Sequence, residues 1–150
     1  DVERSRGLGD VYKRQHEYGA PIIIFDLGTA TTISVVDKNN NYIGGVIMPG
    51  MGISLNAMVS GTSQLPRISL EEPKKIIGSN TVDCMKSGIL YGTASSMDGM
   101  IERIKEEIGE AKVVATGGLA STVIPHCKND IILDDELLLK GLMIIYNKNI

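Results

Sequence analysis

The chain has 150 residues, the length of one domain, with 43 % apolar and 22 % charged residues, which is ordinary for a globular domain with its own core. Its net charge of −3 argues against nucleic-acid binding, and no apolar run approaches the ~18 residues that span a bilayer, so neither nucleic acid nor membrane is an expected partner. Cys84 and Cys127 lie far apart and show no metal-binding spacing, which is typical of free thiols in a cytoplasmic protein.

The first 15 residues differ from the rest of the chain. They are charged, show no regular apolar period, and resemble the translated adaptor tails found at the ends of some assembled sequences. We therefore expect residues 1–15 to be a non-native or disordered tract, and residues 16–150 to form the domain.

Three β-strands are predicted at the start of this domain. They cover residues 21–26, 31–37 and 42–48, which are rich in β-branched and apolar side chains. The links between them are short, so the strands should be antiparallel neighbours. Segment 49–52 contains proline and glycine and is expected to break the sheet, before a short helix from about residue 54 to 60.

A long helix is predicted from Thr81 to about Ile108. Asn80 is a good N-cap, apolar residues recur every three or four positions, and Gly109 is expected to end the helix. The remaining predicted elements are a strand at 112–115, a helix at 118–124, a strand at 131–132 and a last helix from about Asp134.

This order of elements predicts an α/β domain. Three antiparallel strands followed by alternating helices and strands, β-β-β-α-β-α-β-α, are typical of the ribonuclease H-like fold of actin-like ATPases. We expect a mixed five-stranded sheet flanked by helices.

The turn after the first strand is the first candidate site. Gly28 allows the backbone to approach a ligand closely, and the N–H and hydroxyl groups of Thr29 can donate to phosphate oxygens. The carboxylate of Asp26 would need a cation between itself and a phosphate. Gly117 and Gly118 offer a second such turn, which opens a helix. Asp, Gly and Thr are also common turn formers, so these residues could have a purely structural role.

Six motifs, in this order and spacing, closely resemble the type III pantothenate kinase family. They lie at residues 26–32, 44–50, 65–67, 77–82, 87–92 and 115–120. The resemblance covers residues 16–150 and implies ATP-dependent phosphorylation of pantothenate to 4′-phosphopantothenate, the first step of coenzyme A biosynthesis. It also implies a cytoplasmic homodimer that uses ATP, Mg²⁺ and a monovalent cation, K⁺ or NH₄⁺.

The resemblance further implies roles for individual residues. Asp26 falls where the family binds the monovalent cation, and Thr81 falls where it contacts pantothenate. The positions implied for ATP binding are Gly28, Thr29, Gly117 and Gly118. Thr81 also begins a helix, and a helix N-terminus favours an anion such as the pantothenate carboxylate.

Two motifs of the family are not found in this sequence. One is an Asp-x-Gly-Asn-Thr phosphate loop, and the other is a Gly-x-Asp-Arg motif that carries the general base. Since phosphoryl transfer depends on positioning and charge neutralisation, the sequence predicts that this chain is a C-terminal fragment, has no catalytic residue of its own and is inactive alone. The alternatives are a non-catalytic binding or dimerisation module, and an actin-like phosphotransferase with another acceptor.

Overall fold

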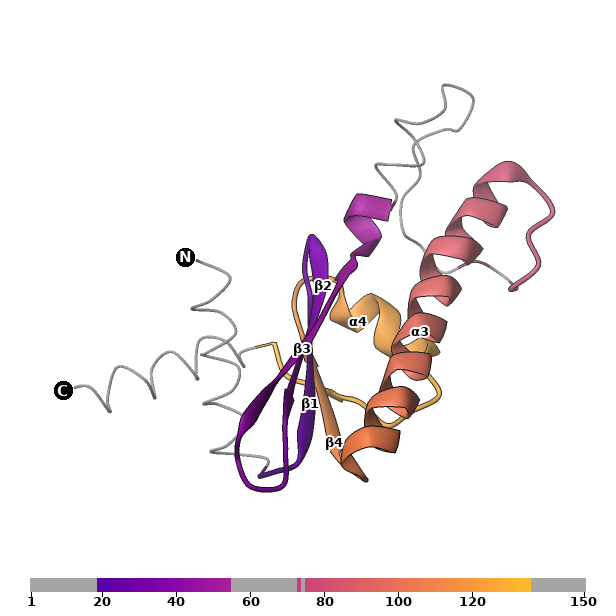
Figure 1. Cartoon of the computed structure of the whole chain (residues 1–150). Helices are drawn as coiled ribbons and strands as arrows, with labels where there is room; N and C mark the ends of the chain where they lie inside the picture. The colour runs from indigo at the N-terminus through magenta and orange to yellow at the C-terminus, as the bar shows by residue number, and fades with distance from the viewer. Residues whose placement is uncertain (1–18, 55–72, 74, 136–150) are drawn as a thin grey trace.

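A mixed five-stranded sheet forms the centre of the protein. The computed structural model describes residues 19–54, 73 and 75–135. The strand order is β3-β2-β1-β4-β5, and helices α3 and α4 lie on the same side of the sheet (Figure 1). The strands are β1 (Ile22–Leu27), β2 (Ala30–Val36), β3 (Tyr42–Pro49), β4 (Lys112–Thr116) and β5 (Ile132–Leu133). The first three are antiparallel neighbours, whereas β4 runs parallel to β1 and β5 parallel to β4, so the predicted fold class is confirmed.

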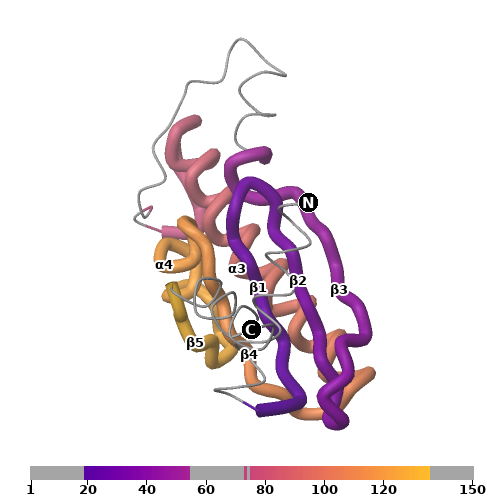
Figure 2. Tube along the Cα trace, turned by 90° about the vertical axis from the view of Figure 1, so that its left-hand side faces the viewer, coloured from indigo at the N-terminus to yellow at the C-terminus, as the bar shows by residue number. Residues whose placement is uncertain are grey.

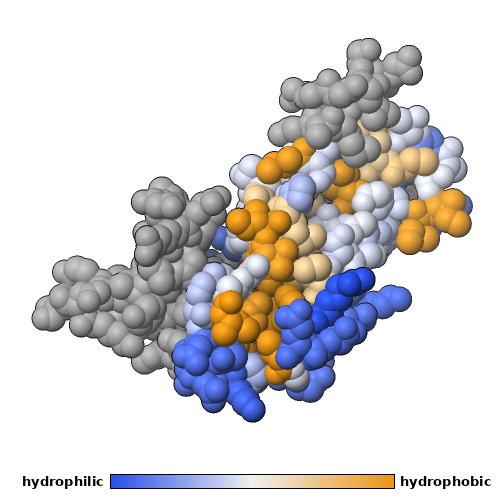
Figure 3. Space-filling model, viewed as in Figure 1, coloured by the Kyte–Doolittle hydropathy of each residue, from blue (hydrophilic) through white to orange (hydrophobic). Residues whose placement is uncertain are grey.

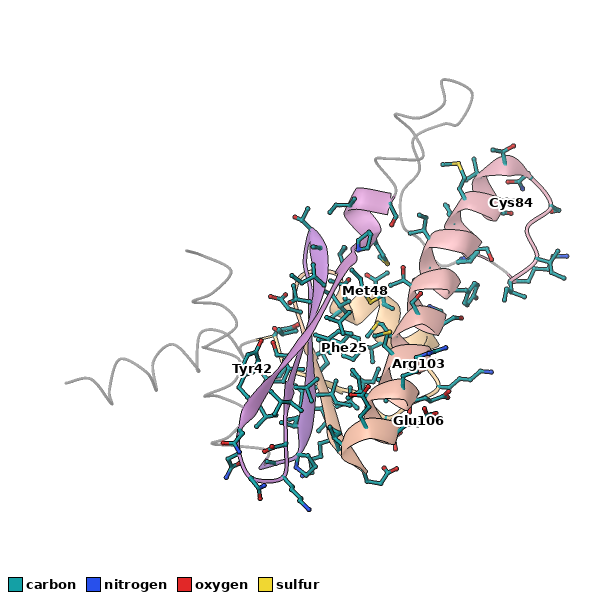
Figure 4. The ribbon with its side chains drawn as sticks, viewed as in Figure 1. Phe25, Tyr42, Met48, Cys84, Arg103 and Glu106 are labelled. Atoms are coloured by element: carbon teal, nitrogen blue, oxygen red, sulfur yellow. The ribbon has the colours of Figure 1, made fainter. Side chains whose placement is uncertain are left out.

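The two faces of the sheet bury different side chains. Because side chains alternate along a strand, Phe25 and Leu27 point toward α3, whereas Ile24 and Asp26 point to the opposite face. Figure 2 shows α3 behind the strands, and Figure 4 shows Phe25 between the sheet and this helix. Apolar residues of β1, β2, β4, α3 and α4 form one continuous core there. A second, smaller cluster on the other face contains Ile22, Ile24, Val36 and Val114.

Helix α3 (Thr81–Ile108) has the predicted ends. The Asn80 side chain accepts a hydrogen bond from the Asp83 N–H at 2.9 Å, which satisfies one of the unpaired donors at the helix start. Gly109 ends the helix with a φ of 86°, a conformation that glycine adopts without strain. The predicted apolar face is confirmed, since Met97 and Ile101 are buried in the core.

The chain after β3 differs from the prediction. The sheet ends within the predicted break at 49–52, because strand β3 continues only through Pro49. Residues 51–54 are already helical, so the predicted helix start near 54 is wrong. Pro49 is tolerated because β3 is an edge strand, where the missing N–H disturbs little of the ladder. The Ser54 N–H donates to the Gly50 carbonyl at 2.9 Å, and Met51 is buried in the core. The rest of that predicted helix lies outside the described residues.

The elements after β4 are shorter than predicted. The predicted helix 118–124 is α4 (Ala120–Val123), followed by a 3₁₀ turn, η1 (Ile124–His126). Pro125 lacks the N–H that would continue an α-helix, which explains the early change of geometry. Strand β5 is shifted by one residue from the predicted 131–132. Most of the predicted last helix lies outside the described residues.

Candidate functional site

The turn between β1 and β2 lies at the edge of the sheet where β1 ends. The Gly28 N–H donates to the Ala30 carbonyl at 3.2 Å, so the chain reverses within very few residues. Gly28 is half-buried and Thr29 is exposed, which leaves the Thr29 hydroxyl accessible to a ligand. The Gly28 N–H is thus used within the turn, whereas the Thr29 side chain is open to solvent. A phosphate site at this turn stays a prediction.

A second turn packs directly against the first. Because β4 runs parallel to β1, both strands end at the same edge of the sheet, which places Gly117 beside Leu27. The Leu119 N–H donates to the Leu27 carbonyl at 3.3 Å. Gly117 has a φ of +105°, and a Cβ atom there would lie 2.6 Å from the Leu27 carbonyl oxygen. Only glycine fits this position without a clash. Because the turn after β4 contacts the Leu27 backbone, the two predicted glycine turns form one continuous backbone surface.

Gly50 is a third part of this surface. A Cβ atom at Gly50 would lie 2.9 Å from the Gly28 carbonyl oxygen and would also clash with the Thr29 carbonyl. The sequence analysis did not assign Gly50 to the site. The signal that could have found it is a Pro-Gly pair at the end of an edge strand, where the chain must turn closely past its neighbour.

Asp26 lies below the turns, on the sheet face opposite α3. It is 7 % exposed and is paired in register with Thr32 on β2 and with Thr116 on β4. Residues paired in register point to the same face, so one carboxylate lies in a row between two hydroxyl side chains. These donors are hard oxygen atoms, which fit the cation that the sequence predicts at Asp26. Within residues 19–54, 73 and 75–135, no three His, Cys, Asp or Glu side chains cluster as metal ligands.

Thr81 lies apart from the glycine turns. It is the exposed first residue of α3, a 28-residue helix that is about 42 Å long at 1.5 Å per residue. Figure 4 shows Cys84, one turn further along, at the end of α3 that projects beyond the sheet, far from Phe25. Among the described residues, the backbone hydrogen bond that joins the two glycine turns runs from the Leu119 N–H to the Leu27 carbonyl, and it does not involve Thr81.

The loop before α3 folds back along the helix. The Ser87 hydroxyl donates to the Ile76 carbonyl, and a Cβ atom at Gly78 would lie 2.5 Å from the Cys84 nitrogen. Ile76 and Ile77 are nevertheless exposed, and Figure 3 shows apolar atoms at this end of α3.

Asp98 connects α3 by hydrogen bonds to the segment between η1 and β5, a role that the sequence analysis did not predict. Its carboxylate accepts hydrogen bonds from the Lys128 N–H at 2.8 Å, the Asn129 N–H at 3.1 Å and the Asn129 side chain at 2.8 Å. Burial alone would raise the pKa of Asp98, but these bonds and the Lys128 charge hold it below its usual value. No spacing in the sequence indicates this contact, because the partners lie about thirty residues apart.

Both cysteines are free thiols, as predicted. Cys84 is exposed, whereas Cys127 is half-buried with its sulfur 3.7 Å from the Val123 carbonyl. Burial, together with the charge of Asp98, raises the pKa of Cys127 to about 12, so its thiol is protonated at neutral pH. His126 is half-buried and packs edge-on against Tyr91, with ring centroids 5.2 Å apart.

The sequence profile of the type III pantothenate kinase family matches residues 8–103. The chain belongs to the type III pantothenate kinase family. The match begins inside the tract 1–15, and the division of the chain at residue 15 stays a prediction.

Curated members of the family are close in sequence. The type III pantothenate kinase of Halalkalibacterium halodurans is 46 % identical over 134 residues, which cover 89 % of this chain and 53 % of that protein. The enzyme of an Exiguobacterium species is 44 % identical over 133 residues, which cover 89 % and 52 %. The chain thus spans about half the length of the curated relatives it matches.

Solved structures share the fold. A Baf family transcriptional activator from Campylobacter jejuni has a TM-score of 0.61 at 22 % identity, covering 94 % of this chain and 64 % of that one. The activator of 2-hydroxyisocaproyl-CoA dehydratase from Clostridium difficile has a TM-score of 0.51 at 16 % identity, covering 97 % and 69 %. The ethanolamine utilization protein EutJ from Carboxydothermus hydrogenoformans also has 0.51 at 16 %, covering 89 % and 51 %. These structural similarities confirm the actin-like fold and give no information about ligands.

Within the described residues, no helix is long and apolar enough to cross a membrane.

Proposed function

We propose that this chain contributes to an ATP-dependent kinase that phosphorylates pantothenate to 4′-phosphopantothenate, the first step of coenzyme A biosynthesis. One observation carries the proposal: in a chain of this family, the two glycine turns are joined by the hydrogen bond from the Leu119 N–H to the Leu27 carbonyl. Two turns that both suit phosphate thereby face one ligand position instead of two separate ones.

Each proposed nucleotide contact has a physical basis in the turns. Gly28 and Gly117 allow ATP phosphates to approach the backbone, where N–H groups can donate, and Gly118 precedes α4 in the same turn. The Thr29 hydroxyl is exposed and can donate to a phosphate oxygen. A monovalent cation at Asp26, with Mg²⁺ on the nucleotide, would supply positive charge that offsets the phosphates.

Thr81 is the proposed contact for pantothenate. Its hydroxyl is exposed at the first turn of α3, where the partial positive charge of the helix end favours the pantothenate carboxylate. The glycine turns and the start of α3 would then serve different substrates. A homodimer in the cytoplasm remains part of the proposal, as does the prediction that this chain alone is inactive.

A chimera tests the proposed function. The segment of the Halalkalibacterium halodurans relative that aligns with this chain is replaced by the 134 matching residues, and ATP-dependent phosphorylation of labelled pantothenate is measured. We expect turnover, and we expect Thr29→Val in the chimera to reduce it through a higher KM for ATP, because a phosphate donor is lost. Thermal unfolding of both proteins shows whether they are folded.

Two outcomes would contradict the proposal. A folded chimera without turnover on pantothenate would reject the kinase assignment. Turnover on another alcohol but not on pantothenate would indicate an actin-like phosphotransferase with a different acceptor.

A further inference from the structure

The loop 75–79 leads directly to the helix start that carries Thr81, the proposed contact for pantothenate. Figure 1 shows this loop beside the projecting end of α3. The Ser87 hydroxyl, at the beginning of the motif 87–92, donates to the Ile76 carbonyl, which immediately precedes the motif 77–82. The sequence analysis assigned no role to the motif 87–92. The structure joins it to the motif that contains Thr81.

The hydrogen bond of Ser87 leaves its own helix. A serine or threonine inside a helix ordinarily donates to the carbonyl four residues earlier. Thr93, further along α3, does so with the Ile89 carbonyl at 2.6 Å. Ser87 is 7 % exposed, and its hydroxyl donates instead to a carbonyl eleven residues earlier, outside the helix. This bond therefore holds the loop and adds nothing within the helix.

Polar and backbone contacts hold the loop, because its large apolar side chains are not buried. Ile76 and Ile77 are 66 % and 75 % exposed, so their burial contributes little. Gly78 packs on the backbone of the first turn of α3, where a Cβ atom would lie 2.5 Å from the Cys84 nitrogen. The position of the loop thus depends on the Ser87 hydroxyl and on the missing side chain at Gly78.

Thr81 directly follows the N-cap, Asn80. The Asn80 side chain accepts a hydrogen bond from the Asp83 N–H at 2.9 Å and donates one to the Asp83 carboxylate at 3.0 Å. These groups lie at the surface, and the first turn of a helix opens easily when the chain before it is not held. A contact that is already in place binds its substrate more tightly, because no free energy is spent on ordering it.

We propose that Ser87 is a positioning residue for pantothenate. Its hydroxyl holds the loop 75–79 against α3, and the held loop keeps the N-cap and Thr81 in place for the substrate. The inference rests on the proposed function, because that function assigns pantothenate to Thr81. Without the hydroxyl, the loop loses its bond at Ile76 and the start of α3 becomes less ordered.

Two substitutions release the loop in different ways, and each has a matched control on α3. Ser87→Ala removes the hydroxyl, and its control Thr93→Val removes a hydroxyl that is bonded within the helix. Gly78→Ala places a methyl group against the Cys84 backbone. Its control is Gly88→Ala, because a Cβ atom at Gly88 would meet no atom within 4 Å.

Amide hydrogen exchange of the full 150-residue chain, followed by NMR, measures how firmly the loop is held. The Asp83 and Cys84 amides are both bonded to the N-cap residue. We expect them to exchange about tenfold faster in Ser87→Ala and in Gly78→Ala, because the first turn opens more often. Both controls should exchange like the unsubstituted chain. Amides in the middle of α3 should be unchanged in all four variants, which shows that the core remains folded.

The chimera with the Halalkalibacterium halodurans relative measures the effect on the substrate. We expect Ser87→Ala and Gly78→Ala to raise the KM for pantothenate about tenfold, because binding must now order the loop. The KM for ATP should stay within about twofold, since neither substitution touches the glycine turns. A general loss of structure would raise both KM values together. Thr93→Val and Gly88→Ala should leave both unchanged.

The outcomes separate this inference from the proposed function. If Ser87→Ala exchanges like Thr93→Val, the hydroxyl does not hold the loop and the inference fails. Faster exchange without a higher KM for pantothenate would show that the loop does not position Thr81, and equal rises in both KM values would show a structural effect. Either result overturns the inference, while turnover by the unsubstituted chimera upholds the proposed function. A folded chimera without turnover rejects the proposed function, and the inference fails with it.

Discussion

Two neighbouring glycines, Gly117 and Gly118, have very different environments in the turn after β4. Gly117 has a positive φ and contacts the backbone of Leu27, whereas a Cβ atom at Gly118 would have no atom within 4 Å. The sequence motif alone does not distinguish the two glycines, but only at Gly117 do the surroundings require a residue without a side chain. The close approach of β4 to β1 at this point creates the difference.

Gly117→Ala is predicted to destabilise the chain by roughly 1–3 kcal/mol, because the new methyl group meets the Leu27 backbone in a strained conformation. Gly118→Ala is the matched control and should change the free energy of unfolding by about 1 kcal/mol or less. Urea denaturation of both variants measures this difference. Equal losses would show that the turn is not packed as described.

Helix α3 organises the domain at the scale of elements. One face completes the core over β1, and its Asp98 binds the chain that leads to β5. Figure 4 shows Arg103 and Glu106 further along the same helix, and both are exposed. A single helix thus joins the antiparallel and parallel halves of the sheet, which brings the two glycine turns to one edge.

Asp98→Asn is predicted to destabilise the chain at pH 7 by roughly 1–3 kcal/mol, since charged hydrogen bonds to Lys128 and Asn129 are weakened. The folded pKa of Asp98 lies below 3.8, so its contribution is complete above that value and is lost as the pH falls through the folded pKa. The difference between the two proteins should therefore shrink on going from pH 7 to pH 3. Urea denaturation at both pH values tests this, with exposed Glu107→Gln as the control. A difference that does not change with pH would contradict it.

Across the whole described molecule, burial is greatest at β1. All six of its residues are buried, and it pairs with β2 on one side and β4 on the other. Strand β3 is an edge strand with alternate residues exposed, and both residues of β5 are exposed. The candidate cation site therefore lies on the most enclosed strand, whereas Thr29 at its end remains open to a ligand.

Amide hydrogen exchange should follow this gradient. The amides of Ile22–Leu27 are predicted to exchange most slowly, and those of β3 and β5 much faster, because exchange reports the free energy of local opening. Mass spectrometry of peptides from each strand gives the order. Protection in β5 that exceeds protection in β1 would contradict the arrangement of the core.

The sequence by itself determined the fold class, the ends of α3 and the residues of the two glycine turns. These features depend on local causes: apolar periodicity, a capping asparagine, and the backbone freedom of glycine at Gly109 and Gly117. The predicted start of the helix after β3 and the predicted bounds of α4 and β5 were less accurate. Those depend on edge-strand position and on packing across the sheet.

Only the tertiary structure decided which residues meet. Thr116 lies opposite Asp26, Gly50 contacts the first turn, and Asp98 binds Asn129, and no spacing in the chain indicates any of these contacts. The physical reason is that strand register and helix placement are set by the burial of the whole core, which brings together residues far apart in the sequence.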